Sequence, residues 1–129
     1  MPETLSAIVF GEMGAQHVDW AELERRFPLE LVFASEAQSL PDIARRRRVI
    51  AVLVAIDQFQ SIRHLLPDVR WIVCHPMSAE PAAETLEEIG AFHAIAYPLR
   101  LDEVRHSLGF VWDAVTRKRT VKVKTINAA

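Results

Sequence analysis

The sequence lacks a second cysteine, a long apolar run and a surplus of charge of one sign. Its single cysteine, Cys74, has no partner for an internal disulfide, which is typical of a reducing compartment. No apolar run approaches the roughly 20 residues of a membrane-spanning helix. The first ten residues, MPETLSAIVF, have no basic segment before their apolar part, so they do not predict a secretory signal. We therefore expect a cytoplasmic domain without membrane contact.

The charge and the hydrophobic content indicate an ordinary globular domain. The formal net charge is −2 over 129 residues, which argues against direct nucleic-acid binding by this domain. Half of the residues are hydrophobic, enough for the core of one domain. We expect a domain over residues 1–119 and a basic tail or linker over 120–129. Arginines 45–48 indicate a solvated helix end or, alternatively, a basic patch that binds a partner.

Apolar runs and helical patterns alternate five times along the chain. The expected strands cover 5–10, 29–33, 49–56, 69–74 and 94–96, and the expected helices cover 20–27, 35–48, 58–66, 80–89 and 101–117. Asp19 is expected to cap the first helix, and Pro28 to end it. This alternation predicts an α/β fold, a five-stranded parallel sheet with five helices on both faces. The expected strand order is the flavodoxin-like 2-1-3-4-5.

Three polar residues follow or end the first, third and fourth expected strands. In an open parallel sheet, ligands bind at the carboxyl ends of the strands. Glu12, Asp57 and His75 are therefore the first candidates for a site. Cys74 and His75 do not predict a Cys–His catalytic pair, because neighbouring residues on a strand point to opposite faces of the sheet.

Four short motifs resemble the second half of response-regulator receiver domains. They are LPDV at 66–69, IVCH at 72–75, Gly90-Ala91 and YPL at 97–99. Receivers run from a proline–aspartate turn into the fourth strand, have Gly-Ala before the fifth strand and close with Lys-Pro. The resemblance covers about residues 5–118. It implies the CheY-like version of the flavodoxin-like fold, with a cis bond before Pro98.

The sequence departs from the receiver pattern at the phosphorylation site. Receivers have two acids after the first strand, a phosphoacceptor aspartate at the third, Thr or Ser at the fourth and Lys-Pro at the fifth. The matching positions here are Gly11 and Glu12, then Ile56, then His75, then Tyr97 and Pro98. Tyr97 is neutral at pH 7 and cannot supply the charge of the lysine. The chain is therefore similar to degenerate receivers (pseudo-receivers), including the receiver-like domains of transcription antitermination regulators.

The roles of Asp57 and Glu12 can each be interpreted in more than one way. Asp57, next to the phosphoacceptor position, is a helix N-cap, a surviving phosphoacceptor or a contact for a partner. Glu12 is a solvated loop acid or, with Asp57, part of a weak Mg²⁺ site.

The resemblance implies signal transduction and regulation through protein contacts, without normal phosphorylation, without a cofactor and without enzymatic activity. The expected partner is a sensor protein, a histidine kinase or an effector domain. It would bind the fourth helix, fifth strand and fifth helix, roughly residues 80–119, a surface that could also form a homodimer. One alternative is a two-component receiver that is phosphorylated on Asp57 with Mg²⁺. Another is a small flavodoxin-like enzyme or nucleotide binder, but residues 11–16, GEMGAQ, lack a Walker lysine.

Overall fold

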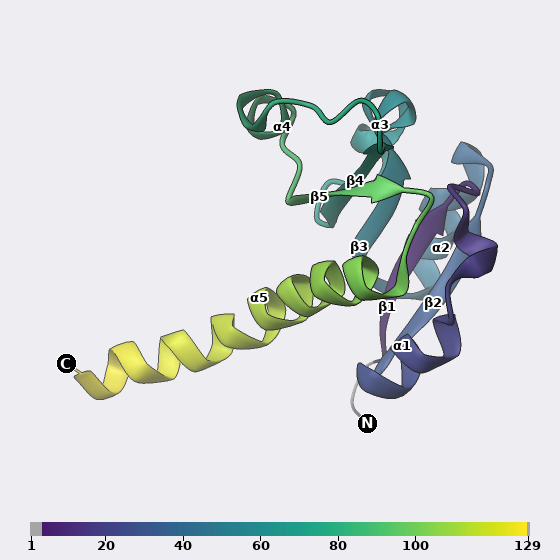
Figure 1. Ribbon diagram of the computed structural model, residues 1–129. Coiled ribbons are helices and arrows are strands. Elements are labelled where there is room, and N and C mark those ends of the chain that lie inside the picture. The colour runs from purple at the N-terminus through teal and green to yellow at the C-terminus, as the bar shows by residue number, and fades with distance from the viewer. Residues whose placement is uncertain (1–3, 129) are drawn as a thin grey trace.

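Five parallel strands form one sheet in the order β2-β1-β3-β4-β5 (Figure 1). The computed structural model describes residues 4–128, with side chains for residues 4–116. The strands are β1 (Leu5–Phe10), β2 (Leu29–Ala34), β3 (Arg48–Ala55), β4 (Arg70–Pro76) and β5 (His93–Tyr97). Every neighbouring pair is parallel. The predicted flavodoxin-like topology is confirmed.

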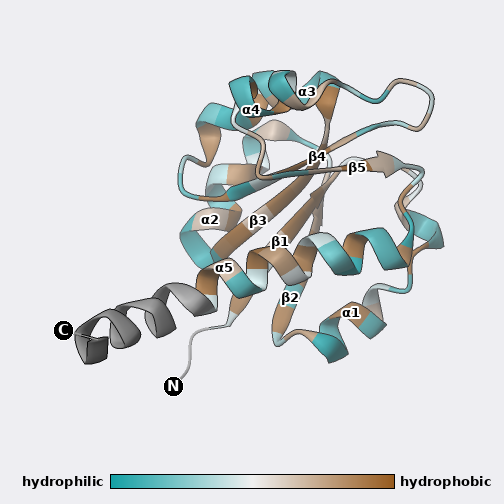
Figure 2. Cartoon of the chain, turned by 60° about the vertical axis from the view of Figure 1, so that its left-hand side comes forward, coloured by the Kyte–Doolittle hydropathy of each residue, from teal (hydrophilic) through white to brown (hydrophobic). Residues whose placement is uncertain are grey.

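Five α-helices cover both faces of the sheet, as predicted (Figure 2). One face carries α1 (Trp20–Arg26) and α5 (Leu101–Ala128). The other carries α2 (Leu40–Arg46), α3 (Ile56–Ile62) and α4 (Ala83–Ile89). Short 3₁₀ turns at 15–17, 37–39 and 63–65 precede α1, precede α2 and follow α3. None of the helices within the described residues is long and apolar enough to cross a membrane.

The sheet separates two hydrophobic clusters. Leu53 of β3 packs with Leu23 of α1 and Leu108 of α5 on one side. Val52 packs with Phe59 of α3 on the other side. All five of these side chains are fully buried. The uninterrupted apolar sequence of β3 therefore reflects a central strand that is covered on both faces.

The first helix begins and ends where its sequence predicts. The carboxylate of Asp19 accepts a hydrogen bond from the backbone N–H of Glu22 at 3.2 Å, which satisfies one free donor of the first turn. Phe27 is the C-cap, directly before Pro28. This capping explains how a helix of seven residues is held at both ends.

The helix expected within 35–48, entered at Ser39 or Pro41, is present with Ser39 as its N-cap, but its outer bounds are wrong. A 3₁₀ turn at 37–39 leads into α2, which has Pro41 in its first turn and ends at Arg46. Arg47 is the C-cap, and Arg48 is already the first residue of β3. The helix begins late because proline is favoured at the first helical positions and not in a helix interior. The arginine run therefore spans the turn from helix to strand.

The predicted end of the third strand is also wrong. Strand β3 ends at Ala55, and Ile56 is the first residue of α3 instead of the last residue of a strand. Ala55 occupies the N-cap position without a side-chain hydrogen bond, so Asp57 is not the N-cap. The half-buried Ile56 packs against the cluster that contains Phe59. Apolar packing therefore places this helix start, and Asp57 lies in its first turn.

Two further helix boundaries differ from the expected ones. Helix α4 begins at Ala83 and not near Glu80. Glu80 precedes Pro81, and the proline ring disfavours the helical conformation of the residue before it. Helix α5 extends to Ala128 and so passes the expected end near 117 and enters the expected tail over 120–129. The side chains of that tail lie outside the described residues.

Candidate functional site

The loop after β1 is held against the turn after β5. The backbone N–H of Leu99 donates to the carbonyl oxygen of Met13 at 2.8 Å. Gly14 has a φ of +72°, and a Cβ added there would lie 2.7 Å from Cβ of Pro98. The Tyr97–Pro98 peptide bond is cis, as the resemblance implied. The carboxyl edge of the sheet is therefore a closely fitted scaffold.

Glu12 and Asp57 lie on segments that meet at this edge. Glu12 is an exposed residue of the loop after β1, and Asp57 is exposed in the first turn of α3. The two segments approach closely, since a Cβ added at Gly11 would lie 3.5 Å from Oε1 of Gln58. Within the described residues, no three His, Cys, Asp or Glu side chains form a group that could hold a metal ion. The edge therefore offers isolated exposed carboxylates and not a set of three side-chain ligands.

His75 lies inside β4 and not beyond its end. It is 6% exposed, and its Nδ1 lies 2.9 Å from the carbonyl oxygen of Pro76. Because a carbonyl oxygen only accepts hydrogen bonds, Nδ1 is the donor in this contact. His75 therefore offers no hydroxyl at the position that matches the Thr or Ser of receivers.

Cys74 is a packing residue on the opposite face from Val73. It belongs to the cluster with Leu53 and Leu108, whereas Val73 belongs to the other cluster. Burial raises the pKa of its thiol to about 12. The thiol therefore stays protonated at neutral pH and is not a nucleophile.

The fifth strand ends on a neutral side chain. Tyr97 is half-buried and packs against the cluster beneath α5, while Pro98 is exposed. No lysine precedes Lys118 anywhere in the sequence. No residue of 1–117 can therefore supply a lysine amine in place of the one that receivers have at the position of Tyr97.

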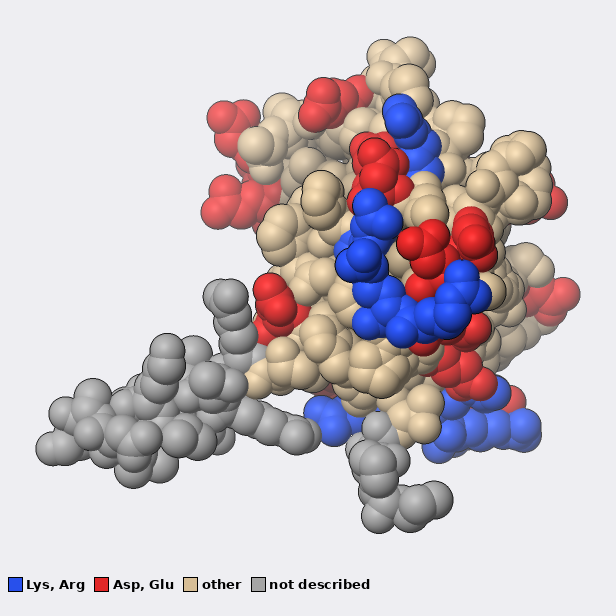
Figure 3. All heavy atoms as spheres, turned by 60° about the horizontal axis from the view of Figure 1, so that its bottom comes forward, with Lys and Arg blue, Asp and Glu red and all other residues tan. Residues whose placement is uncertain are grey.

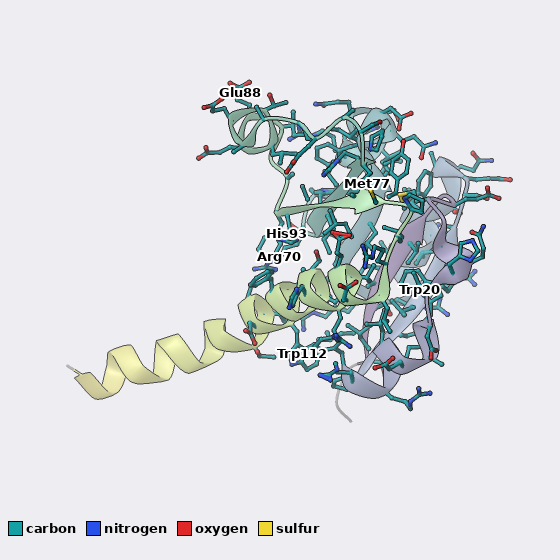
Figure 4. The ribbon with its side chains drawn as sticks, in the orientation of Figure 1. Trp20, Arg70, Met77, Glu88, His93 and Trp112 are labelled. Carbon is teal, nitrogen blue, oxygen red and sulfur yellow. The ribbon has the colours of Figure 1, made fainter. Side chains whose placement is uncertain are left out.

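Aromatic side chains are exposed around β5 and α5. Phe92 is 40% exposed and Phe110 is 53% exposed. The His93 ring contacts Phe110 edge-on with centroids 5.1 Å apart, and the Arg70 guanidinium lies 5.7 Å from the Phe92 ring centroid. His93 and Arg70 are drawn beside β5, above α5 (Figure 4). The sequence reasoning placed a contact surface here without identifying these two phenylalanines.

The helix beside this aromatic group is acidic. Glu84, Glu87 and Glu88 of α4 are all exposed, and residues 71–99 contain no lysine or arginine. A groove of about 390 Å³ between α4 and the sheet is lined by Glu80, Glu87 and both His75 and His93, among others. The α4–β5–α5 surface therefore combines exposed aromatic rings with negative charge.

Comparisons with known proteins find matches among solved structures. No protein-family model matches the sequence, and the comparison with curated proteins gives no match. The signal receiver domain of a putative Luxo repressor protein from Vibrio parahaemolyticus has a TM-score of 0.68 at 11% identity, covering 93% of this chain and 98% of that chain. A receiver domain protein from Methanospirillum hungatei JF-1 has a TM-score of 0.63 at 12% identity, covering 91% and 99%. The structure of the P1 domain of CheA3 in complex with CheY6 from R. sphaeroides gives 0.59 at 18% identity, covering 86% and 98%.

The fold is that of response-regulator receiver domains. The matched structures span nearly the whole chain and nearly the whole of each matched domain. At 11–18% identity the likeness is one of fold. The role of this receiver fold has to be argued from its own side chains.

Acidification is expected to destabilise this receiver fold through His93. Burial, and secondarily the nearby His106, lower the pKa of His93 below its ordinary value of 6.5. The unfolded chain then takes up the proton more readily than the folded chain. The stabilising contribution is complete above about pH 6.5 and is lost as the pH falls below that value.

Urea unfolding at a series of pH values measures this effect. The variant His93→Gln should show a shallower loss of unfolding free energy on acidification than the native chain. The variant His64→Gln, at an exposed position, should keep the native slope. An equal slope in His93→Gln and the native chain would contradict the assignment.

Proposed function

We propose that this chain is a receiver-like regulatory domain that signals through protein contacts and not through an aspartyl phosphate. One contrast carries the proposal. The scaffold at the carboxyl edge is retained, with the loop after β1 closed onto Pro98. The chemical groups are replaced, with glycine at 11, histidine at 75 and tyrosine at 97 where the resemblance expects an acid, a hydroxyl and a lysine.

The chemistry of phosphoryl transfer supports this reading. Transfer to a carboxylate depends on cations that compensate the charge of the phosphoryl oxygens. Mg²⁺ needs oxygen ligands in near-octahedral geometry. Glu12 and Asp57 are exposed, without a third acidic or histidine ligand among the described residues. Phosphorylation of Asp57 with Mg²⁺ held by Glu12 remains the alternative function.

The proposed contact surface is α4–β5–α5. Exposed Phe92 and Phe110 supply apolar area, and the acidic α4 favours a partner with basic residues at the rim of the contact. The solved complex of CheA3 with CheY6 is a protein–protein complex. We propose by analogy a sensor protein, histidine kinase or effector domain as partner, as in the antitermination regulators, or a second copy of this chain.

Labelling with acetyl phosphate tests the absence of phosphorylation. Native protein and Asp57→Asn are incubated with acetyl phosphate and Mg²⁺, and intact mass is measured. The proposal predicts no phosphoryl adduct on either protein. An adduct on the native chain that Asp57→Asn abolishes would replace the proposal with the phosphorylated alternative.

Self-association tests the homodimer version of the contact. Sedimentation velocity over a concentration series should show a dimer that Phe110→Glu weakens by at least about tenfold, since a buried aromatic is a typical hot spot. Phe33→Glu is the matched control, because Phe33 on β2 is 54% exposed and Phe110 is 53% exposed. If both variants weaken the dimer equally, the dimer interface is not the α4–β5–α5 surface.

A further inference from the structure

The amino edge of the sheet, opposite the edge described above, carries two arginine-lined grooves. The first, of about 600 Å³, is lined by Arg45, Arg47, Arg48 and Arg70, with one carboxylate, Asp68, among its described lining residues. The second, of about 730 Å³, is lined by arginines 45–48 and Glu30. Figure 3 shows a band of basic side chains across this face, with acidic side chains beside it.

The turn from α2 to β3 produces this arrangement. Arg45 and Arg46 lie in the last turn of α2, Arg47 is the cap and Arg48 begins β3. A run that changes from helix to strand presents its side chains in several directions. Three of the arginines line both grooves, namely Arg45, Arg47 and Arg48. Arg70 begins β4, the neighbouring strand, and pairs in register with Ala51 of β3. The first groove thus gathers cations from segments that are distant in the sequence.

Three of these arginines are paired with partly exposed carboxylates, and Arg70 lies over the ring of Phe92. Arg45 and Arg46 pair with Asp42 at 3.0 and 3.6 Å, and Arg47 pairs with Glu30 at 2.6 Å. Exposed ion pairs contribute little to stability, so their loss or rearrangement costs little. A guanidinium has five donors, which allows it to bind a second oxyanion while it keeps one partner.

The walls of the first groove limit the kind of anion that fits. Its volume falls within the roughly 300–1,000 Å³ of small-molecule sites. Arginine forks bind phosphate oxygens in bidentate geometry. Leu65, Pro67 and Val115 supply an apolar wall on which a less polar part of a ligand can pack. Asp42, Glu30 and Asp68 interrupt the basic band, which disfavours a long polyanion such as a nucleic-acid strand.

We propose that the first groove binds a small organic phosphate ester, with its phosphate on Arg45, Arg47, Arg48 and Arg70 and its less polar part on the apolar wall. The site lies at the opposite edge from the loop after β1, so it is separate from the receiver-type site. The proposal does not rest on the proposed signalling function, but the groove adjoins the α4–β5–α5 surface, because Arg70 also lies over the ring of Phe92.

Calorimetric titration of the full chain with ATP tests this proposal. Pyrophosphate represents the phosphate part of ATP, and adenosine represents its less polar part. We expect saturable binding of ATP that weakens with added salt, weaker binding of pyrophosphate and no binding of adenosine. If ATP binding does not saturate at concentrations up to about 5 mM, the upper limit for a weak but specific site, the proposal is wrong. Equal binding of adenosine and ATP would also overturn it, as would much tighter binding of an RNA oligonucleotide through the same arginines.

Some variants are expected to weaken ATP binding and one to tighten it, a combination that a folding defect cannot produce. Arg45→Gln and Arg70→Gln should each weaken ATP binding about tenfold, because each removes charge-assisted hydrogen bonds. Arg25→Gln, an exposed arginine on α1, makes the same charge change and should leave the affinity unchanged. Asp68→Asn should tighten binding about threefold, because it removes a like charge from the groove. Equal weakening by Arg25→Gln, or no tightening by Asp68→Asn, would contradict the site.

Discussion

Replacing Gly14 with alanine is expected to lower the free energy of unfolding by about 2–5 kcal/mol. Two physical causes add. An L-residue in the left-handed region costs about 1–2 kcal/mol, and Gly14 has a φ of +72°. Overpacking costs a further 1–3 kcal/mol or so, because the new Cβ would lie 2.7 Å from Cβ of Pro98 and 3.0 Å from its Cα. These atoms belong to a turn that is itself bonded to Met13, so they have little room to move.

Chemical denaturation of Gly14→Ala and Gly109→Ala measures the effect with a matched control. Gly109 lies within α5, and a Cβ added there would meet Cζ of Phe27 at 3.8 Å, an ordinary contact. The same substitution there should stabilise the protein by about 0.5–1 kcal/mol, because alanine is the better helix former. If Gly14→Ala is as stable as the native chain, the loop after β1 does not close onto Pro98 as described.

Truncating Phe59 to alanine is expected to cost about 3–5 kcal/mol, the usual loss for a buried aromatic. Phe59 is fully buried between α3 and the sheet, and its ring meets Trp71 edge-on with centroids 5.3 Å apart. Removing it leaves a cavity beneath the helix that carries Asp57. The change should also alter the fluorescence of Trp71.

Phe33→Ala is the control for this truncation. The Phe33 ring also meets a tryptophan edge-on, Trp20, with centroids 5.3 Å apart, but Phe33 is 54% exposed. Its loss should cost less than about 1.5 kcal/mol, the upper range for such a ring pair. Equal losses at Phe59 and Phe33 would show that α3 is not packed on the sheet in solution.

Much of the fold could be predicted from the sequence because its signals are local. The continuous apolar run of β3 indicated a strand covered on both faces, and Asp19 and Pro28 marked the ends of α1. The receiver-like motifs predicted the cis bond before Pro98, which the structure confirms. Periodicity and turn residues act within a few positions, so they can be recognised without knowing what packs against them.

The errors arose where tertiary packing decides a local boundary. A strand end at Ile56 and a cap at Asp57 are each reasonable by residue type, but Ile56 packs into the core from the first position of α3. The arginine run was expected at a helix end, whereas its last residue belongs to β3. At Ile56 apolar packing sets the helix start, whereas α2 begins at the position that Pro41 favours.

The candidate sites could be predicted only in part. The replacements at positions 11, 75 and 97 are visible in the sequence, as is the absence of lysine before residue 118. The burial of His75 and the packing of Gly14 on Pro98 depend on contacts between distant segments. The first arginine groove joins Arg45, Arg70 and Val115, which no sequence pattern connects.

A Mg²⁺ titration with and without beryllofluoride, followed by tryptophan fluorescence, tests the central claim most directly. The Trp20 indole donates to the carbonyl oxygen of Ala15 at 2.8 Å, so Trp20 reports on the loop that carries Glu12. Trp71 contacts Phe59 and reports on α3, which carries Asp57. A receiver-like domain without the phosphorylation chemistry should give a flat response up to about 10 mM Mg²⁺, with or without this phosphoryl mimic. A saturable change that beryllofluoride strengthens and Asp57→Asn abolishes would contradict the account.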